Sequence, residues 1–405
     1  MNKRTWKVML ALISMLALVA ASCSSSSTDT TTGSGDEDSD TTSAEGEAAP
    51  ELEGEPIVVG MIGDATGPTS DVGVSYIEGQ RGYVEYINAN GGAGGREIDL
   101  VWQDYQYDVA VAEQLYEQYT SEGAVAFMGW GTGDTEALKE RITEDEIPFI
   151  SASLSEALAD PSETPYNFLP AATYSEQIRV ALKHIADEGG SSVAVFHNDS
   201  PFGTSPLADA EKYIADEGLD IEFQSIAMPG GVTDFVGQIT QAGDVDYVII
   251  QNVPSPAATL VNDLVSSGND AQVICLNWCG NEVLVELAGD NAEGVLAVQP
   301  FLAKNSGAEG LADIQATGGD DVQIGYIHGW FAMQSMISAI GDVVESGDEV
   351  TGPAIKEALE SQKLTTGGIS ADISYSADSH AGMSGAPIQV VTDGEWTPFK
   401  DVIVP

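Results

Sequence analysis

The sequence is poor in basic residues. Its 405 residues include 14 Lys and Arg against 64 Asp and Glu, which gives a formal net charge of −50 at pH 7. Nucleic acid and anionic membrane surfaces bind proteins through a basic patch, so neither is expected as a partner of this chain. The excess of acid is interpreted as a means of staying soluble, for instance in salty surroundings that screen self-repulsion. A specific cationic partner is the alternative.

The usual signatures of catalysis are also missing. The four histidines are scattered, and no HExxH, GxSxG or GxxxxGK[ST] motif occurs. A glycine-rich turn, MGWGTGDTEAL, comes near a dinucleotide fingerprint, but Asp134 stands where the motif needs its third glycine. A carboxylate at that helix N-terminus would repel a pyrophosphate. We therefore expect no enzyme, no bound metal and no cofactor.

Cysteine is scarce, and the first of three marks the N-terminal region. A basic start (Lys3, Arg4 and Lys7) precedes an apolar stretch, residues 8–21, that is too short to span a membrane comfortably. The stretch is typical of a secretory signal peptide. Small residues then precede Cys23, in a sequence that resembles the lipobox of bacterial lipoproteins and predicts a lipidated cysteine. An ordinary signal peptide with a chance cysteine is the alternative.

The sequence after Cys23 is rich in Ser, Thr, Gly, Asp and Glu and has no aromatic residue before residue 56. Such a segment cannot bury enough apolar surface to fold, and its acids repel one another. We therefore predict a signal peptide over residues 1–22 and a disordered acidic tether over residues 23–55. If Cys23 is lipidated, Cys275 and Cys279 are the two remaining cysteines, and both would lie outside the cytoplasm. They could form a disulfide there or stay as two separate buried thiols.

From residue 56 onward, short apolar runs alternate with helical patterns, which predicts parallel sheets covered by helices. The predicted strands are residues 57–62, 98–102, 124–128, 147–151, 192–196, 221–226, 245–250, 272–276 and 294–300. The predicted helices include residues 76–87, 112–119, 136–143, 206–217, 256–267 and an amphipathic one over 327–344. A pause at residues 157–172 divides the pattern into two lobes in series. The tail segments SADISYS and PIQVVTDGEW are predicted to pair near a turn at Asp393-Gly394.

Two neighbouring strands of the first lobe end in turns rich in hydrogen-bond donors. Thr132 and Thr135 follow one strand, and the segment ISASLS (residues 150–155) ends the next. Ligands of open α/β sheets bind at the carboxyl ends of strands, near a switch in strand order. These hydroxyls and the first helical N–H groups predict a place for one carboxylate or amide oxygen of a small ligand. The alternative is that they only cap their own helix.

At this point the chain resembles the type I periplasmic binding proteins, specifically the leucine/isoleucine/valine-binding group of ABC transporters. The segments that carry the resemblance are IVVGMIGDATGPTSDVG, YINANGGAGGREIDLVWQD, EDEIPFISASLS, HNDSPFG and ELAGDNAEGVLAV. The resemblance implies two Rossmann-like lobes joined by three crossings, near residues 170–175, 299–303 and 368–375. Lobe 1 is expected to comprise residues 56–172 plus 302–370, and lobe 2 residues 173–301 plus 371–405.

The resemblance further implies a non-enzymatic, extracytoplasmic lipoprotein that closes on a small molecule by a hinge motion and delivers it to an ABC permease. A lipid anchor would be its only attachment to the membrane, and a monomer is expected. The ligand carboxylate would be held by Thr132, near Gly131, and by Ser153 (backbone) and Ser155 (hydroxyl). Phe202 would cover the ligand, without the hydroxyl of the tyrosine that relatives often carry there.

One position departs from the family pattern. Amino-acid binders usually place an acid after the strand at residues 272–276, to pair with the ligand ammonium, whereas Asn277 stands there with Trp278 beside it. A buried, unpaired ammonium is costly, so either another acid such as Glu282 serves or the ligand is an amide, a urea-like compound or a carboxylate. Trp130 and Trp278 favour a flat-walled pocket, with core packing as the alternative. A branched-chain or related amino acid is the first expectation, and a sensor or an enzyme is the least favoured.

Overall fold

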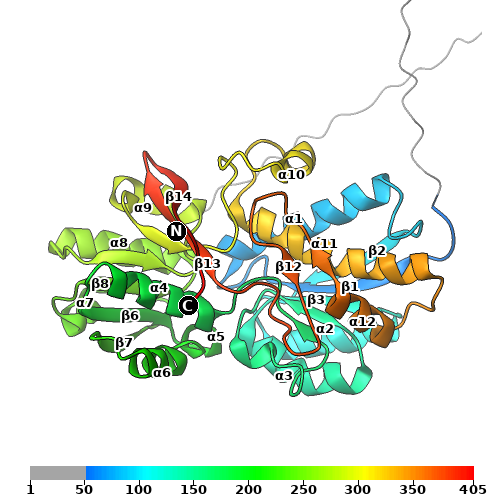
Figure 1. The fold of residues 1–405 in the computed structure, drawn as a ribbon, viewed down its shortest axis with the longest axis horizontal. Helices are drawn as coiled ribbons and strands as arrows, with labels where there is room; N and C mark the ends of the chain where they lie inside the picture. Colours follow the sequence, from blue (N-terminus) through cyan, green and yellow to red (C-terminus); the bar gives the residue numbers. More distant parts are fainter. Residues whose placement is uncertain (1–51) are drawn as a thin grey trace, which may run out of the picture. The chain divides into compact units, whose positions relative to one another are not determined.

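The computed structural model describes residues 52–405 (Figure 1). The predicted signal peptide, the predicted lipidation site at Cys23 and nearly all of the predicted tether lie outside the described residues. Within the described range, no helix is both long enough and apolar enough to cross a membrane.

The first of two main sheets is wholly parallel, with the strand order β2-β1-β3-β4-β5. Strand β1, which lies between β2 and β3, is buried on both faces. Helices α1 (Ser70–Ala89) and α11 (Ile324–Ser346) cover one side of it, and α2 (Val109–Ser121) and α3 (Thr132–Asp145) cover the other (Figure 1). This explains why its sequence, IVVGMIG, is a continuous apolar run rather than an alternating one. The strands are β1 (Ile57–Gly63), β2 (Ile98–Asp104), β3 (Ala126–Gly129), β4 (Phe149–Ser151) and β5 (Asn167–Phe168).

The second sheet has seven strands in the order β14-β13-β10-β9-β8-β6-β7. Its first five strands along the chain are parallel, and β13 and β14 add an antiparallel edge. The strands are β6 (Ser192–Asn198), β7 (Glu222–Met228), β8 (Tyr247–Gln251), β9 (Gln272–Cys275), β10 (Leu296–Val298), β13 (Ala386–Thr392) and β14 (Glu395–Ile403). The predicted α/β architecture with two parallel-sheet lobes is therefore confirmed.

Helices fill most of the connections between strands. They are α1 (Ser70–Ala89), α2 (Val109–Ser121), α3 (Thr132–Asp145), α4 (Tyr174–Asp187), α5 (Pro201–Thr204), α6 (Leu207–Glu217), α7 (Val236–Ala242), α8 (Pro254–Ser267), α9 (Glu282–Ala288), α10 (Leu311–Gly318), α11 (Ile324–Ser346) and α12 (Gly352–Ser361). Single 3₁₀ turns lie at Glu156–Leu158 and Gly289–Ala292.

Two expectations for the C-terminal third are wrong in part. The turn at Asp393-Gly394 does join two strands, β13 and β14, and both turn residues have positive φ, as a tight hairpin turn requires. The segment SADISYS, however, forms the short strand β12 (Ile373–Ser374), which pairs with β11 (Lys363–Leu364) instead. Helix α11 is not amphipathic but buried nearly all round, because it packs on α1 and also reaches the core of the second sheet through Ile324.

The chain passes between the two sheets more than once. Residues that follow β10, such as Phe301, pack in the core of the first sheet, and so do Ile373, Tyr375 and Met383. Ala386, at the start of β13, packs in the core of the second. The exact division into lobes and the three predicted crossings stay predictions.

Helices α1 and α11 approach each other closely enough to require glycine. A Cβ added at Gly79 would lie 2.0 Å from the Tyr326 carbonyl oxygen, and one at Gly329 would lie 2.0 Å from the Tyr76 carbonyl oxygen. Each glycine thus faces backbone of the other helix. Because backbone cannot rotate away as a side chain can, this contact fixes the distance between the helices.

We expect Gly329→Ala to lower the free energy of unfolding by about 1–3 kcal/mol, because the added methyl must push α1 and α11 apart. Gly237→Ala, in helix α7, is the matched control, since a Cβ there meets nothing within 4 Å. The control is expected to be neutral or to stabilise by less than about 1 kcal/mol. Urea unfolding of both variants measures the difference, and equal stabilities would contradict the close contact.

Candidate functional site

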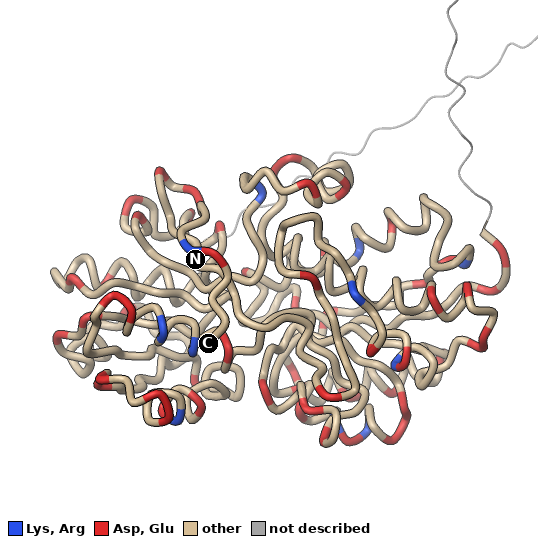
Figure 2. Tube along the Cα trace, viewed as in Figure 1, with Lys and Arg blue, Asp and Glu red and all other residues tan. Residues whose placement is uncertain are grey.

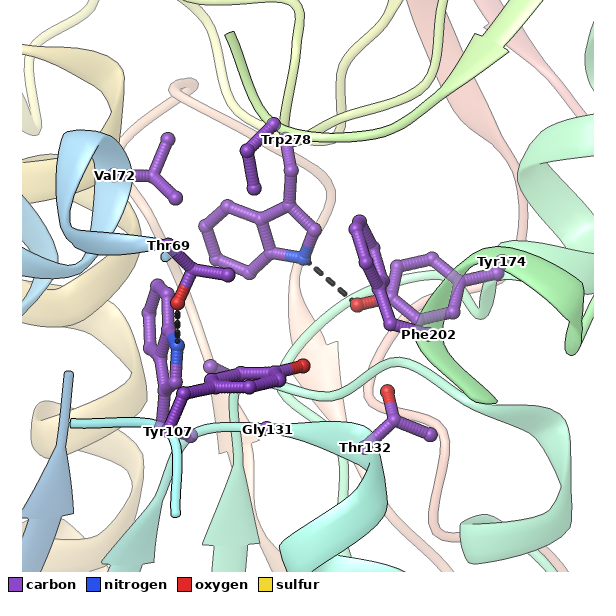
Figure 3. A pocket seen from close by; sticks show the side chains of 11 residues that line it. Thr69, Val72, Tyr107, Gly131, Thr132, Tyr174, Phe202 and Trp278 are labelled. Atoms are coloured by element: carbon purple, nitrogen blue, oxygen red, sulfur yellow. Dashed lines mark hydrogen bonds between the residues drawn. The ribbon is translucent and has the colours of Figure 1, made fainter. Parts of the chain in front are cut away.

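A small pocket lies between the carboxyl ends of the two sheets (Figure 3). Each lining residue belongs to a segment that follows a strand, so the pocket lies at the carboxyl ends of the strands, where parallel sheets bind their ligands. The lining residues are Thr69, Val72, Tyr107, Trp130, Gly131, Thr132, Ala152, Tyr174, Phe202, Val253 and Trp278.

The pocket sits at the switch points of both strand orders. In the first sheet, the chain runs outward from β1 to β2 on one side and continues through β3 on the other. In the second sheet, β6 lies between β7 and β8 in the same way. Loops that follow neighbouring strands diverge there to opposite faces, which leaves a crevice for a ligand.

Hydroxyl groups gather on one side of the pocket. The Thr132 hydroxyl lies 2.7 Å from the Ser153 hydroxyl, and the Tyr107 hydroxyl lies close to the Thr132 backbone. The Tyr174 hydroxyl also contacts Thr132, and burial raises the pKa of this phenol and of Tyr107. Both phenols therefore stay protonated near neutral pH, and, like the Thr132 hydroxyl, they can donate to an oxygen of a ligand.

Aromatic rings form the opposite walls, and their polar edges are already satisfied. The Trp130 indole N–H donates to the Thr69 hydroxyl at 2.8 Å, and the Trp278 indole N–H donates to the Tyr174 hydroxyl at 2.8 Å (Figure 3). The two indole rings lie 5.3 Å apart, and both contact the ring of Tyr76 behind them. These bonds hold the two rings in fixed positions and leave neither indole N–H free to donate to a ligand.

The loop that carries Tyr107 is backbone-strained. Gln106 and Tyr107 both have φ near +60°, a left-handed conformation that costs non-glycine residues of the order of 1 kcal/mol each. The carboxylate of Asp104 stabilises this loop, because it accepts hydrogen bonds from the N–H groups of Ala65 and Gln106, both at 3.0 Å. This left-handed backbone conformation places the Tyr107 ring in one wall of the pocket.

Two buried carboxylates hold the loops behind the first-sheet wall. Asp64 accepts hydrogen bonds from the Gly67 N–H at 2.6 Å and from both the N–H and the hydroxyl of Thr69, at 2.9 and 2.6 Å. Asp134 accepts from the Tyr105 hydroxyl at 2.9 Å and the Gly131 N–H at 3.2 Å. Burial raises the pKa of Asp134 to about 7, although both hydrogen bonds act to lower it.

The structure brings five of the predicted site residues together: Trp130, Gly131, Thr132, Phe202 and Trp278 all line the pocket. Ser153 and Ser155 do not line the pocket. The Ser153 hydroxyl is hydrogen-bonded to that of Thr132, and the Ser155 hydroxyl donates to the Glu136 carboxylate at 3.4 Å. The two interpretations of the glycine-rich turn, ligand binding and helix capping, each apply to one of its threonines. Thr132 faces the pocket, whereas Thr135 bonds to the Gly131 carbonyl and to Ser151 and serves its own helix.

Asn277 does not line the pocket. Its N–H donates to Gln177 and its carbonyl accepts from Gln299, so its backbone is fixed, while its side-chain amide is buried without a hydrogen-bond partner among residues 52–405. Glu282 does not reach the pocket either. Its carboxylate accepts the N–H of Ile324, at the start of α11, at 3.0 and 3.2 Å.

A further carboxylate joins helices of the two sheets. Asp71, at the start of α1 on the first sheet, accepts hydrogen bonds from the N–H and the hydroxyl of Ser255 at 2.9 and 2.7 Å. Ser255 lies in the first turn of α8, on the second sheet. Burial raises the pKa of Asp71, against the two bonds from Ser255. We call the contact between Asp71 and Ser255 the rim contact.

Cys275 and Cys279 are free thiols, so the disulfide left open by the sequence is not formed. Cys275 ends strand β9, and the Cys279 thiol turns back to donate to the Ile250 carbonyl at 3.2 Å. Both are buried in the apolar core of the second sheet. Burial raises the pKa of Cys275 well above its ordinary value, which keeps it protonated and unreactive.

Six lining residues were not predicted from the sequence. Tyr107, Ala152 and Val253 follow the ends of β2, β4 and β8, and the strand-end rule used for Thr132 would have found them. Thr69 and Val72 lie further along the segment after β1. Tyr174 begins helix α4, where the chain crosses between sheets, and no local pattern in the sequence marks it.

The pocket is uncharged in a chain that is otherwise strongly acidic. Acidic positions are spread over the helices and loops of the described chain, with few basic ones between them (Figure 2). None of the eleven lining residues carries an ionisable acid or base of ordinary pKa near neutrality. Among residues 52–405, no group of three or more His, Cys, Asp or Glu side chains is placed to hold a metal ion.

This fold and pocket define a two-lobed α/β protein that encloses a small molecule at the carboxyl ends of its strands. A family model described as periplasmic binding protein matches residues 56–395. The chain therefore belongs to the periplasmic binding protein family, whose members bind small molecules outside the cytoplasm for transport and are not enzymes.

Individual relatives agree with this assignment. The leucine-, isoleucine-, valine-, threonine- and alanine-binding protein of Pseudomonas aeruginosa is 23% identical over 341 residues, which cover 79% of this chain and 86% of that protein. A chemotactic signal transduction system substrate-binding protein of Halobacterium salinarum is 28% identical, over 52% of this chain and 54% of its own length. The structure of a branched chain amino acid ABC transporter protein from Thermus thermophilus with bound valine has a TM-score of 0.82 and 27% identity, covering 87% of this chain and 98% of that one.

We expect Asp134→Asn to change how stability depends on pH. The folded-state pKa is raised from 3.8 to about 7, so between these values the unfolded chain releases this proton and the folded chain keeps it. Wild-type stability relative to the variant should therefore fall by about 1.4 kcal/mol per pH unit as the pH rises toward 7, and level off above it. Urea unfolding at several pH values measures this difference. Glu140→Gln, an exposed change on the same helix, controls for the lost charge, and parallel curves for wild type and Asp134→Asn would contradict the expectation.

Proposed function

We propose that this protein captures a branched-chain or related aliphatic amino acid outside the cytoplasm and delivers it to the permease of an ABC importer. The observation that carries this proposal is the two-sided character of the pocket. Hydroxyls of Thr132, Tyr107 and Tyr174 meet on one side, and apolar surfaces such as Val72 and Val253 lie on the other.

The ligand carboxylate would lie at the hydroxyl side, at the N-terminus of α3. Thr132 is the first residue of that helix, whose leading N–H groups and dipole favour an anion. The aliphatic side chain would lie against Val72 and Val253, which come from opposite sheets and so meet only when the cleft is closed. The valine bound to the Thermus thermophilus relative supports a ligand of this class.

A carboxylate without an amino group is the second candidate. The absence of an acid among the lining residues favours it, because nothing there pairs directly with an ammonium. An amide or urea-like ligand has less support, since Asn277, on which that alternative rested, lies outside the pocket. A sensor role has support from the chemotactic relative of Halobacterium salinarum.

Closure by a hinge forms part of the proposal. Lobe 1 would comprise residues 56–172 plus 302–370 and lobe 2 residues 173–301 plus 371–405, with crossings near 170–175, 299–303 and 368–375. The rim contact between Asp71 and Ser255 joins helices of different sheets, so it would form on closing and break on opening.

The N-terminal region completes the proposal. The signal peptide of residues 1–22 would direct export, and Cys23 would carry the lipid that anchors a monomeric protein to the membrane. Residues 23–55 would tether the binding domain near its permease, since a chain of like charges extends itself.

A thermal-shift panel tests the ligand class. Valine, leucine and isoleucine should raise the melting temperature by several degrees at saturation, because they bind only the folded state. Urea, short amides and short carboxylates form the rest of the panel. A shift with these alone would replace the amino-acid proposal.

Thr132→Val should weaken binding of the identified ligand about tenfold, because it removes a hydroxyl bonded to a charged group and keeps the volume. Thr240→Val, an exposed helical threonine, makes the same chemical change away from the pocket and should bind as the wild type does. Calorimetric titration measures both, and an unchanged affinity in Thr132→Val would remove this residue from the site.

Cys23→Ser should release the protein from the membrane fraction into the soluble extracytoplasmic fraction, because the variant has no thiol to lipidate. Export and ligand binding should stay unchanged. Fractionation of cells followed by immunoblotting measures this, and continued sedimentation of Cys23→Ser with membranes would contradict the lipid anchor.

A further inference from the structure

The pocket raises the question of what meets the positive end of an amino-acid ligand. This question rests on the proposed function, since only a ligand with an ammonium group poses it. An ammonium that loses its hydration needs a partner, and a carboxylate is the usual one. None of the eleven lining residues supplies a carboxylate.

The carboxylates nearest the pocket wall are already engaged. Asp64 accepts three hydrogen bonds from the loop that carries Thr69, and Asp134 accepts two, from Tyr105 and Gly131. Both side chains are buried behind the wall, at 0% and 2% exposure. Turning either toward the ligand would leave several backbone and hydroxyl donors without a partner.

The carboxylates on the rim are engaged as well. Asp71 accepts both donors of Ser255, and Glu282 accepts the N–H of Ile324 with both oxygens. Each therefore joins an element of one sheet to an element beside the other, outside the pocket lining.

Ring faces, by contrast, are abundant in the pocket. Five of the eleven lining residues are aromatic: Tyr107, Trp130, Tyr174, Phe202 and Trp278. Trp278 and Tyr107 lie on opposite sides of the space, with Phe202 and Tyr174 closing its end (Figure 3). The rings of Phe202 and Tyr174 meet edge to face, 5.5 Å apart. Because both indole N–H groups are bonded to hydroxyls, what these rings present to a ligand is π surface.

We propose that these ring faces receive the positive end of the ligand, and that the pocket therefore prefers an N-methylated amino acid, of the betaine type, to the primary amine. A primary ammonium carries three N–H donors that π faces satisfy poorly. A trimethylammonium has no donor, is weakly hydrated, and packs its methyl groups on rings that attract its charge. The carboxylate of such a ligand binds at Thr132 as proposed above.

Valine and glycine betaine provide a sharp comparison because they are isomers with the same net charge. They differ in whether methyl groups sit on carbon or on nitrogen. Calorimetric titration of the full-length chain in detergent with each compound, and with tert-butylacetate, measures the preference. Tert-butylacetate has the shape of glycine betaine with carbon in place of the charged nitrogen.

Glycine betaine is expected to bind at least tenfold more tightly than valine and about tenfold more tightly than tert-butylacetate. Valine binding more tightly than betaine would overturn this inference and leave the proposed function standing. Binding of tert-butylacetate as tight as that of betaine would also overturn it, because the charge would then contribute nothing. Binding of none of the three would overturn both proposals.

Phe202→Leu tests the rings directly, because it replaces a π face by an aliphatic side chain and removes no side-chain hydrogen bond. We expect betaine affinity to fall about three- to tenfold, and tert-butylacetate affinity to change less than twofold. Phe399→Leu makes the same change at an exposed ring on β14 and is the matched control. Equal losses of affinity for both compounds would show that Phe202 contributes packing alone and would contradict recognition of the charge by its ring.

Asp71→Asn tests the alternative that Asp71, in the rim contact, is the counter-ion of the ligand. If Asp71 paired with the ligand, this variant would lose betaine binding far more than tert-butylacetate binding, and the inference would be overturned. With ring recognition, the two affinities should shift together, by the same factor.

Discussion

Two parallel sheets whose carboxyl ends face a common space constrain everything else in this structure. A parallel strand must return by a crossover on one side, so all its outgoing loops emerge at the same edge. Every lining residue of the pocket follows a strand for this reason, from Thr69 after β1 to Trp278 after β9. The chain reads as a long alternation of strands and helices, yet its binding site collects one to three residues from each of many connections.

Acidic residues have two distinct roles in this chain. Among residues 52–405, most are exposed or partly exposed, where water and salt solvate and screen them. A few are buried around the cleft, where each accepts hydrogen bonds from loop or helix N–H groups. Asp64 is the clearest case, since it fixes the loop whose threonine in turn orients Trp130. The pocket thus gains rigid walls from buried charge without presenting that charge to the ligand, which separates the support of the site from its chemistry.

The parts of the structure that repeat a strong local pattern could be predicted from the sequence. The inner strands of both sheets, such as β1, β3 and β8, are apolar runs bounded by turn residues, and the turn at Gly131 and Thr132 follows one of them directly. The pairing of β12 could not be predicted, because a two-residue strand has no periodicity and its partner is fixed by packing. Asn277 and Trp278 are neighbours, yet only Trp278 faces the pocket, and which of two adjacent residues points inward depends on the local turn. Tyr174 contributes a hydroxyl from a crossing between sheets, a purely tertiary event. The hydrogen bonds from the Ile324 N–H to the Glu282 carboxylate join residues 42 positions apart, so no local sequence pattern predicts them either.

The rim contact between Asp71 and Ser255 has a consequence for the rate of release. Because this contact joins helices of different sheets, its two hydrogen bonds would have to break before the lobes could open, as proposed, and release a bound molecule. A contact of this kind lengthens residence time even where it adds nothing to recognition, because differences in affinity among related complexes arise mostly in the dissociation rate. For a carrier, long residence prevents loss on the way and delays hand-over on arrival. A receiving partner that inserts a competing group at the α8 N-terminus would remove the delay and leave the pocket itself untouched.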